Sequence, residues 1–357
     1  MAAYTTVDDS EAHFQAVLYT GDGSADHAIT FDDTDTDMQP DMVWIKNRDA
    51  TDSHCLFDAV RGATKVIHPD AQDAETTDTD TLDSFTSDGF QVDADVKVNT
   101  NTEDYVAWCW KANGTGSSNT DGSINTTATS ANTTAGFSIV NYTGTGSGGA
   151  TIGHGLGLVP DFIITKNRVG TGGAGDWHTF HGANTSAPET DYLMLNEANA
   201  TTDHNQRWND TMPTTTLVTF GDDTGPNQSG SSIMAYIWSS IQGFSKFGTY
   251  GPGNAAADGP FIYTGFKPAY LLIKITDAAS IWVIQDNKRP GYNLTNIYSA
   301  ANTTTAEPTN LGVDFLSNGF KIRDADTEVN GSGKNYIYAA FAEAPFVNSN
   351  GVPCTAK

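Results

Sequence analysis

The sequence repeats itself three times, with a period of roughly a hundred residues, and a periodic chain folds as an array of similar units. The apolar run MVWIK at 42–46 recurs as FIITK at 162–166 and as YLLIK at 270–274, each time two residues after a proline. Farther along each copy, an Asn precedes a bulky aromatic residue by eleven positions: Asn99 to Trp110, Asn227 to Trp238 and Asn330 to Phe341. We therefore expect three related modules rather than one large domain.

The repeats divide the chain into six segments. These are an N-terminal arm (1–11), module 1 (12–112), a linker (113–135), module 2 (136–242), module 3 (243–347) and a C-terminal tail (348–357). The linker consists almost wholly of Gly, Ser, Thr, Asn and Ala, a composition typical of a flexible or extended connection. Because modules 2 and 3 meet without such a spacer, we expect a hinge after module 1 and a more rigid contact between the other two.

Short apolar runs separated by Gly, Thr, Ser, Asn and Asp indicate an all-β protein, and no long helical periodicity is present. In module 1 we expect strands at 14–19, 42–46, 56–57, 90–92 and 105–110. The last of these, YVAWCW, is apolar throughout, which favours a strand buried on both faces. The fold class expected is three tandem antiparallel modules resembling a β-sandwich or jelly roll.

An Asp and an Arg recur between the two anchors of the repeat. Asp58 and Arg61 in module 1 match Asp286 and Arg289 in module 3, at the same distances after Lys46 and Lys274, the lysines that end the recurring apolar run. Module 2 breaks this pair and places His181 in the position of the Asp. We interpret the pair as an ion pair that fixes a loop onto the sheet, with ligand binding as the alternative; Asn99, Asn227 and Asn330 are likewise read as structural positions of the repeat.

The charge of the chain excludes several classes of partner. The formal net charge is −25, and only 18 basic residues are present, scattered along the sequence. Nucleic acid and anionic membrane surfaces require clustered Lys and Arg, so neither is expected as a partner. No stretch approaches the ~18 apolar residues of a spanning helix, and the N-terminus lacks the pattern of a signal peptide, so we expect a soluble chain without membrane insertion.

Motifs for catalysis are absent from the sequence. There is no phosphate-binding glycine loop and no Gly-x-Ser-x-Gly elbow. His54, His154, His178, His181 and His204 join a Ser-His-Asp set only if their partners are chosen freely from a chain rich in Ser and Asp. No catalytic residue is assigned, and the chain is not expected to be an enzyme.

Cysteine usage argues against a disulfide scaffold. Cys55, Cys109 and Cys354 cannot all pair within one chain, and none has metal-ligand spacing. Cys109 lies within the apolar run 105–110, where we expect a small buried side chain.

Two kinds of ligand site are kept as candidates. Asp32, Asp33, Asp35 and Asp37 offer the carboxylate oxygens that calcium prefers, without EF-hand spacing, and a solvated acidic loop is the alternative. No other cofactor is expected. Trp177, Trp208 and Tyr292 lie in polar surroundings and are candidates for stacking on a sugar, together with His181; the alternative for a loop tryptophan is to cover a small core.

Several runs of the chain resemble a repeated β-rich module found in structural proteins of tailed bacteriophages, marine and cyanobacterial ones above all. The runs are TIGHGLGLVPDFIITK, IMAYIWSSIQGFSKFGTYGPG, GPFIYTGFKPAYLLIK and FLSNGFKIRDADTEVNGSGKNYIYAAFAEAPF, with MQPDMVWIKNRD and FDAVRG in module 1. Together they cover nearly the whole chain.

The resemblance implies a non-enzymatic protein on the virion surface, at the tail or on the outside of the head. Its expected task is that of a tail fibre or appendage protein that adsorbs to a glycan or protein of the host surface. The arm and module 1 would bind other virion proteins, and a homotrimer is expected. A capsid decoration or vertex protein that stabilises the shell is the main alternative, and a glycan depolymerase is a minor one.

Overall fold

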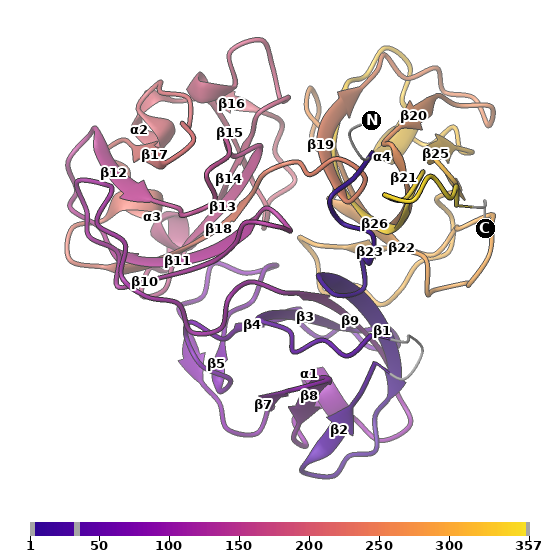
Figure 1. Ribbon diagram of the computed structural model, residues 1–357, viewed down its shortest axis with the longest axis horizontal. Helices are drawn as coiled ribbons and strands as arrows, with labels where there is room; N and C mark the ends of the chain where they lie inside the picture. Colours follow the sequence, from indigo (N-terminus) through magenta and orange to yellow (C-terminus); the bar gives the residue numbers. More distant parts are fainter. Residues whose placement is uncertain (1–3, 32–35, 355–357) are drawn as a thin grey trace.

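The three copies of the repeat fold into three lobes of β-structure around a common centre (Figure 1). The computed structural model describes residues 4–31 and 36–354. Each lobe holds one larger antiparallel sheet that faces the centre and a smaller sheet on its outer side. The all-β fold class and the sandwich character expected from the sequence are confirmed.

Module 1 has the simplest large sheet, and the other modules follow its order. Its strands run β1 (Phe14–Thr20), β9 (Asp104–Trp110), β3 (Met42–Asn47) and β4 (Cys55–Asp58). The outer sheet contains β2 (His27–Ile29), β8 (Gly89–Val92) and β7 (Leu82–Thr86); β5 (Lys65–Val66) pairs with β6 (Thr76–Thr77), and α1 (Val96–Asn99) precedes β9. The five strands expected in this module are all present.

Module 2 extends the same sheet on both sides. The order is β10 (Ala128–Asn132), β11 (Phe137–Thr143), β18 (Ser232–Trp238), β13 (Phe162–Asn167), β14 (Trp177–His181), β15 (Asp191–Met194) and β16 (Thr202–Asp203). Its outer pair is β12 (Ala150–Gly153) and β17 (Leu217–Phe220). The short helices are η1 (Gly172–Gly175), η2 (Pro188–Thr190), α2 (Asn205–Trp208) and α3 (Thr224–Asn227).

Module 3 repeats the pattern with longer strands. Its large sheet runs β19 (Ser245–Tyr250), β26 (Tyr336–Pro345), β21 (Phe266–Ile275), β22 (Val283–Asp286) and β23 (Ser299–Ala300). The outer sheet contains β20 (Phe261–Tyr263), β25 (Gly319–Ile322) and β24 (Val313–Leu316), and α4 (Thr327–Asn330) precedes β26. In the described part of the chain, no helix has the length and apolar character needed to span a bilayer.

Alternation along each central strand explains the two layers. In β3, Val43 and Ile45 point outward and pack with Phe90 and Val92 of the outer sheet, which makes a local core. Met42 and Trp44 point the other way, toward the centre of the molecule. Strands that are buried on both faces must be apolar throughout, and this is why the runs at 42–46 and 105–110 show so little alternation.

The inward faces of all three sheets share one hydrophobic core. Phe14 of module 1 stacks on Phe341 of module 3 with ring centroids 5.4 Å apart, and Phe162 of module 2 stacks on Phe247 of module 3 at 5.6 Å. The ring of Trp110 meets that of Trp238 at 6.4 Å. A cavity of about 20 Å³ remains among these apolar side chains.

The segment expected to be a flexible linker is instead part of the module 2 sheet. Residues 128–132 form β10, which pairs with β11 along its whole length. Before it, Ser117 and Thr129 exchange two backbone hydrogen bonds, and Ile124 is buried in the outer core of module 2. A Ser/Thr-rich sequence is compatible with an edge strand because its hydroxyls remain solvated or bond to the backbone. With module 1 also packed into the common core, no hinge follows it.

The described part of the N-terminal arm lies on module 3 (Figure 1). Val7 is buried in the common core, Thr5 donates to the carbonyl of Gln242, and Asp8 accepts a backbone hydrogen bond from Ser349 in the tail. The described parts of the arm and the tail are therefore joined to each other, and the arm is joined to residues at the start of module 3 and the end of module 2.

The recurring Asn holds the loop that follows the opening strand of each module. Asn99, Asn227 and Asn330 end α1, α3 and α4, are completely buried, and bond through both side-chain atoms to backbone groups of that loop. A glycine of the same loop touches the backbone just after the Asn, so close that an added Cβ would lie 2.2 to 2.3 Å from a carbonyl oxygen. These glycines are Gly21, Gly144 and Gly253.

Candidate functional site

The Asp position of the repeat lies where two modules meet, and it is completely buried. The carboxylate of Asp58 binds Arg61 and accepts a hydrogen bond of 2.7 Å from the hydroxyl of Tyr236, which belongs to module 2. The carboxylate of Asp286 binds Arg289 at 2.7 Å and accepts from the indole of Trp108 in module 1 at 3.0 Å. Each pair thus fixes a turn, as expected, and also joins two modules.

The third contact of this kind uses different groups on both sides. His181 stands at the Asp position, since it pairs with Phe162 as Asp58 pairs with Met42. Ala339 stands where Trp108 and Tyr236 supply a donor, so module 3 offers only a backbone carbonyl. The Nε2 of His181 donates to the carbonyl of Tyr338 at 3.1 Å. The two residues that depart from the repeat, His181 and Ala339, thus lie at the same contact. The donor that Ala339 cannot supply comes from the ring of His181.

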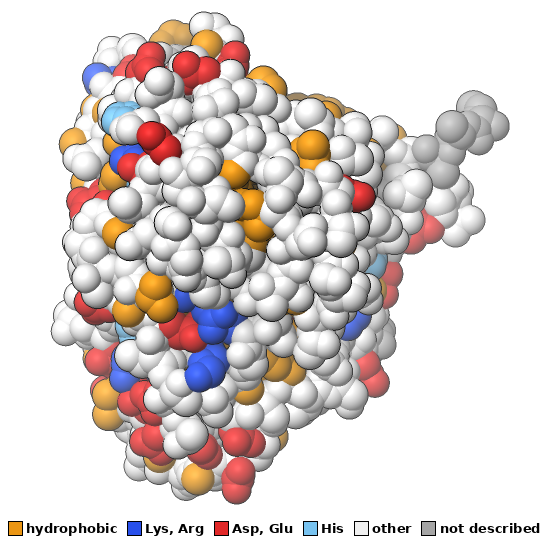
Figure 2. Space-filling model, turned by 90° about the vertical axis from the view of Figure 1, so that its left-hand side faces the viewer, with side chains coloured by type: hydrophobic (Ala, Val, Ile, Leu, Met, Phe, Trp, Pro, Cys, Tyr) orange, Lys and Arg blue, Asp and Glu red, His pale blue; other side chains and the backbone are white. Residues whose placement is uncertain are grey.

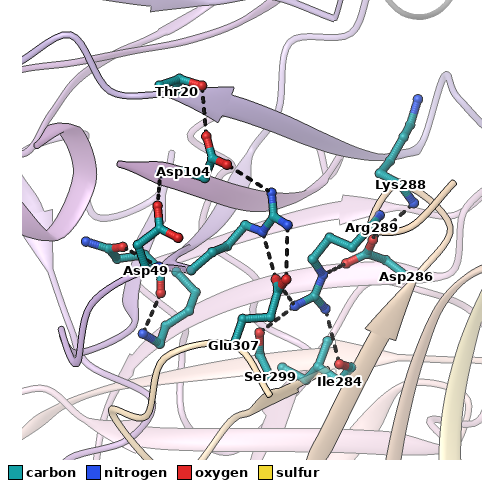
Figure 3. A network of polar contacts seen from close by, with 12 residues as sticks. Thr20, Asp49, Asp104, Ile284, Asp286, Lys288, Arg289, Ser299 and Glu307 are labelled. Atoms are coloured by element: carbon teal, nitrogen blue, oxygen red, sulfur yellow. Dashed lines mark hydrogen bonds and ion pairs between the residues drawn. The ribbon is translucent and has the colours of Figure 1, made fainter. Parts of the chain in front are cut away.

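An Arg–Glu–Arg cluster crosses two of the three contacts between modules. Glu307 of module 3 accepts two hydrogen bonds from Arg48 of module 1, at 2.7 and 3.0 Å, and a third from Arg289 at 3.2 Å (Figure 3). Between modules 2 and 1, Glu75 accepts from Arg168 at 2.7 and 2.8 Å and from Arg61 at 3.2 Å. Planar guanidinium groups suit such two-point binding of carboxylates.

The lysine that ends each MVWIK-type run is also buried and bonded to loop carbonyls. Lys46 donates to the carbonyls of Asn47 and Ala50, Lys166 to that of Gly175, and Lys274 to those of Ala198 and Ser280. Burial lowers the pKa of each of these lysines to about 8. They are structural groups, since none reaches solvent.

The histidines that sequence reasoning considered for catalysis are mostly inside the protein. His54, His154, His178 and His181 are at most 2% exposed, and His204 caps α2. Burial lowers the pKa of His54 and His178 to about 3 and that of His181 to about 4, so all three are neutral at pH 7. His54, His154 and His181 each donate a ring N–H to a backbone carbonyl, as structural histidines do.

The two tryptophans expected to stack on a sugar are buried, and this expectation is wrong for both. Trp177 is 0% exposed and donates its indole N–H to the carbonyls of His68 and Ala71 in module 1. Trp208 is 1% exposed and packs on Phe180 and Phe220. Both cover cores, as the alternative held. His181 is also buried, in the contact with Tyr338 of module 3. Tyr292 is 71% exposed.

The candidate calcium site lies largely outside the described residues, which begin again at Thr36 and include only Asp37 of its four acids. Among the described residues, no group of three or more His, Cys, Asp or Glu side chains is arranged to hold a metal ion. Cys109 is buried with a raised pKa caused by burial, in agreement with the small apolar role expected for it, and all three cysteines are free.

An open groove that sequence reasoning missed lies beside strand β20. It has a volume of about 420 Å³ and is lined by Tyr4, Lys246 and Tyr263, among others. The ring of Tyr263 is 47% exposed, with the ammonium of Lys246 5.5 Å from its centre, and Phe261 on the same face of the strand is 46% exposed. The signal was present in the sequence as Phe-Ile-Tyr, an alternation that turns both aromatic residues outward when the strand's middle residue is buried.

A second open pocket lies between modules 2 and 3. Its volume is about 440 Å³, and its lining includes Asn184, Thr201, Thr249, Thr276 and Asp277. Its side chains are short and polar, in contrast to the aromatic groove. Both the groove and the pocket are hollow enough to take a small ligand.

Figure 2 shows the side of the molecule that lies to the left in Figure 1. Uncharged polar side chains and backbone cover most of this face, and acidic and basic side chains appear in small separate groups. On this face the described residues form no broad basic patch of the kind that binds nucleic acid.

Comparison with known proteins gives a family but no characterised relative. No curated protein and no solved structure matches the chain significantly. One family profile matches residues 9–345, a span that includes modules 1 and 2, the linker and all but the last two residues of module 3. The chain therefore belongs to the family described as a domain of unknown function (DUF7483).

Proposed function

We propose that this protein is a non-enzymatic component of a tailed-bacteriophage virion surface, of tail-fibre or appendage type, that adsorbs to glycans of the host. The phage assignment rests on the resemblance of the repeated runs to virion structural proteins. The observation that carries glycan binding is the pair of exposed aromatic residues on β20: Tyr263 lines the groove, and Phe261 is exposed two residues earlier on the same face of the strand. Aromatic faces of this kind pack on the apolar faces of sugar rings.

Burial of the reactive side chains supports a role without catalysis. The histidines with the most strongly lowered pKa values, His54, His178 and His181, are at most 2% exposed. The two Asp–Arg pairs are fully buried and bond to side chains of a neighbouring module, so their carboxylates do not face solvent. A depolymerase would need two carboxylates across an open cleft. The two open sites offer one carboxylate between them, that of Asp277.

A capsid decoration or vertex protein is the second candidate, and the common core favours it. The three lobes are joined by one continuous hydrophobic core, which gives a single solid body instead of a string of separate modules. Such a body is suited to sit on a shell and bridge its subunits. The homotrimer remains a prediction for either role, and mass photometry of the purified chain tests it.

Location on the particle separates the two candidates. Immunogold labelling of virions with an antibody against residues 136–347 should mark the tail or one vertex if the protein adsorbs to hosts. Label spread over the head would contradict adsorption and support decoration of the shell. Absence of label from purified particles that contain every other virion protein would contradict both.

Glycan binding is tested with the purified full chain on an array of bacterial surface polysaccharides. We expect binding that falls about tenfold or more, equivalent to ~1.4 kcal/mol, in Phe261→Ala and Tyr263→Ala. Tyr292→Ala is the matched control, because Tyr292 is an exposed aromatic residue of the same module away from the groove. Equal loss in all three variants, or loss only in the control, would show that the groove is not the site.

A further inference from the structure

One of the three contacts between modules lacks the Arg–Glu–Arg cluster. The backbone identifies the missing members, because the Glu N–H donates to the Arg carbonyl in both intact contacts: Glu75 to Arg168 at 2.7 Å and Glu307 to Arg48 at 2.9 Å. Between modules 2 and 3, the same hydrogen bond runs from Thr201 to Thr276 at 2.8 Å. Thr201 therefore occupies the position of the Glu, and Thr276 that of the Arg.

The third member of the cluster is also replaced by a shorter side chain. Arg61 and Arg289 lie three residues after the Asp position, and Asn184 lies three residues after His181. The Thr201 hydroxyl donates to Oδ1 of Asn184 at 2.8 Å. This uncharged hydrogen bond stands at the position of the Glu–Arg contact in the other two module contacts. Two long guanidinium side chains and one long carboxylate are thus absent, and the 440 Å³ pocket occupies their place.

The lining of this pocket selects for a ligand rich in hydroxyl groups. The hydroxyls of Thr249 and Thr276 donate to backbone carbonyls, at 2.7 and 3.2 Å, which leaves their oxygen lone pairs to accept from a ligand. Asn184 accepts through Oδ1 and so presents its NH₂ group as a donor. Exposed Asp277 and Asn335 at the rim add further acceptors and donors.

Charge and size narrow the ligand class. An anionic ligand would meet the carboxylate of Asp277 in a chain of net charge −25. The described residues that line the pocket include no Lys or Arg, and the Lys334 ammonium lies 3.8 Å from the Asp277 carboxylate at the rim. Volumes of 300–1,000 Å³ are typical of small-molecule pockets. We propose that the pocket between modules 2 and 3 binds a neutral saccharide of one or two rings.

This site is separate from the aromatic groove and needs no phage role for the protein. The groove is lined by Ser245, Lys246 and Phe247 of β19, whereas the pocket is lined by Thr249 near the other end of the same strand. Variants in the pocket and variants in the groove therefore test the two sites independently.

The decisive variant rebuilds the cluster in the third contact. Thr201→Glu combined with Thr276→Arg places the same pair that joins the other modules, so it should fold, and it leaves the net charge unchanged. Binding would be measured by saturation-transfer NMR with the full chain and a panel of neutral sugars: glucose, galactose, N-acetylglucosamine, maltose and lactose, each at ~10 mM to reach millimolar Kd values. We expect at least one to bind the unmodified chain and lose its signal in the double variant.

Two further variants keep the test sharp. Asn335→Ala removes an exposed amide at the rim and should weaken binding several-fold without affecting folding. Thr202→Glu adds a carboxylate at the neighbouring exposed position, which does not line the pocket, and should bind as the unmodified chain does. Absence of binding by every sugar of the panel would overturn the proposal. Binding that survives in Thr201→Glu/Thr276→Arg, or that is lost in Tyr263→Ala instead, would also overturn it.

Discussion

The buried Asp58–Arg61 pair should be one of the strongest single contributions to stability in the chain. Both side chains are fully buried, and the carboxylate accepts hydrogen bonds from the Arg61 backbone at 2.9 Å, from its guanidinium and from Tyr236 at 2.7 Å. Asp58→Ala leaves a buried guanidinium without its nearest carboxylate, a change that typically costs ~3–5 kcal/mol. Since Arg61 keeps Glu75 at 3.2 Å and two backbone carbonyls, we expect the lower end, about 3 kcal/mol.

Urea unfolding followed by tryptophan fluorescence provides the assay. With a denaturant slope of roughly 3 kcal/mol per molar, the midpoint should fall by about 1 M. Tyr236→Phe, which removes only the contact from module 2, should cost ~1.5 kcal/mol. Because the three modules share one core, each variant should unfold in a single transition that moves as a whole.

Asp314→Ala is the matched control for this series. Asp314 pairs with Arg323 at 3.6 Å on the surface, with side chains 21% and 45% exposed, and such pairs contribute ~0–1 kcal/mol. If Asp58→Ala costs no more than Asp314→Ala, the argument from burial fails. If module 1 unfolds in a separate early transition while the rest keeps its midpoint, the shared core does not couple the modules.

Three other predictions concern titration and reactivity. Burial holds the pKa of His54, His178 and His181 at about 3, 3 and 4, below the ~6.5 of the unfolded chain, so their contribution to stability is complete above pH ~6.5 and is lost as pH falls toward 4. The melting temperature should therefore drop between pH 6.5 and 5, and it should drop less in His181→Gln. A melting temperature that does not change over this pH range would contradict the burial of neutral histidines. Burial likewise lowers the pKa of Lys46, Lys166 and Lys274 to about 8 from ~10.4, so unfolding takes up protons above pH 8 and stability should rise from pH 8 to ~9.5. Substitution of all three lysines by Met should remove this rise in stability. A rise that persists in the triple variant would show that other groups cause it. Ellman's reagent should titrate Cys354 in the native protein and reach Cys55 and Cys109 only after denaturation; fast reaction of more than one thiol would show that the cores open readily.

Much of the fold could be predicted because it repeats. Three appearances of an apolar run with an Asn and an aromatic residue at fixed spacing determined the number of modules, the central strands and the identity of the Asp–Arg pairs. The strand limits followed from local composition, as β3 and β9 show. The sequence also located the exception at His181, since a replacement stands out when two other copies agree.

What the sequence could not show is how the modules meet. A tryptophan in polar surroundings has the same local pattern whether it faces solvent or another lobe, and Trp177 is buried only because module 1 covers it. The prediction of a flexible linker at 113–135 is wrong for the same reason, since β10 becomes a strand only by pairing with β11.

The open sites depend on tertiary structure most of all. The residues of the pocket between modules 2 and 3, among them Asn184, Thr201 and Thr276, are common in loops and carry no motif. Only the contact itself shows that they replace the members of an ionic cluster. The sequence by itself determined the repeating unit, because local periodicity follows from backbone geometry. The arrangement of the three units decided which repeated residues became core, which became contacts and which were left open to a ligand, because burial is set by neighbours distant along the chain.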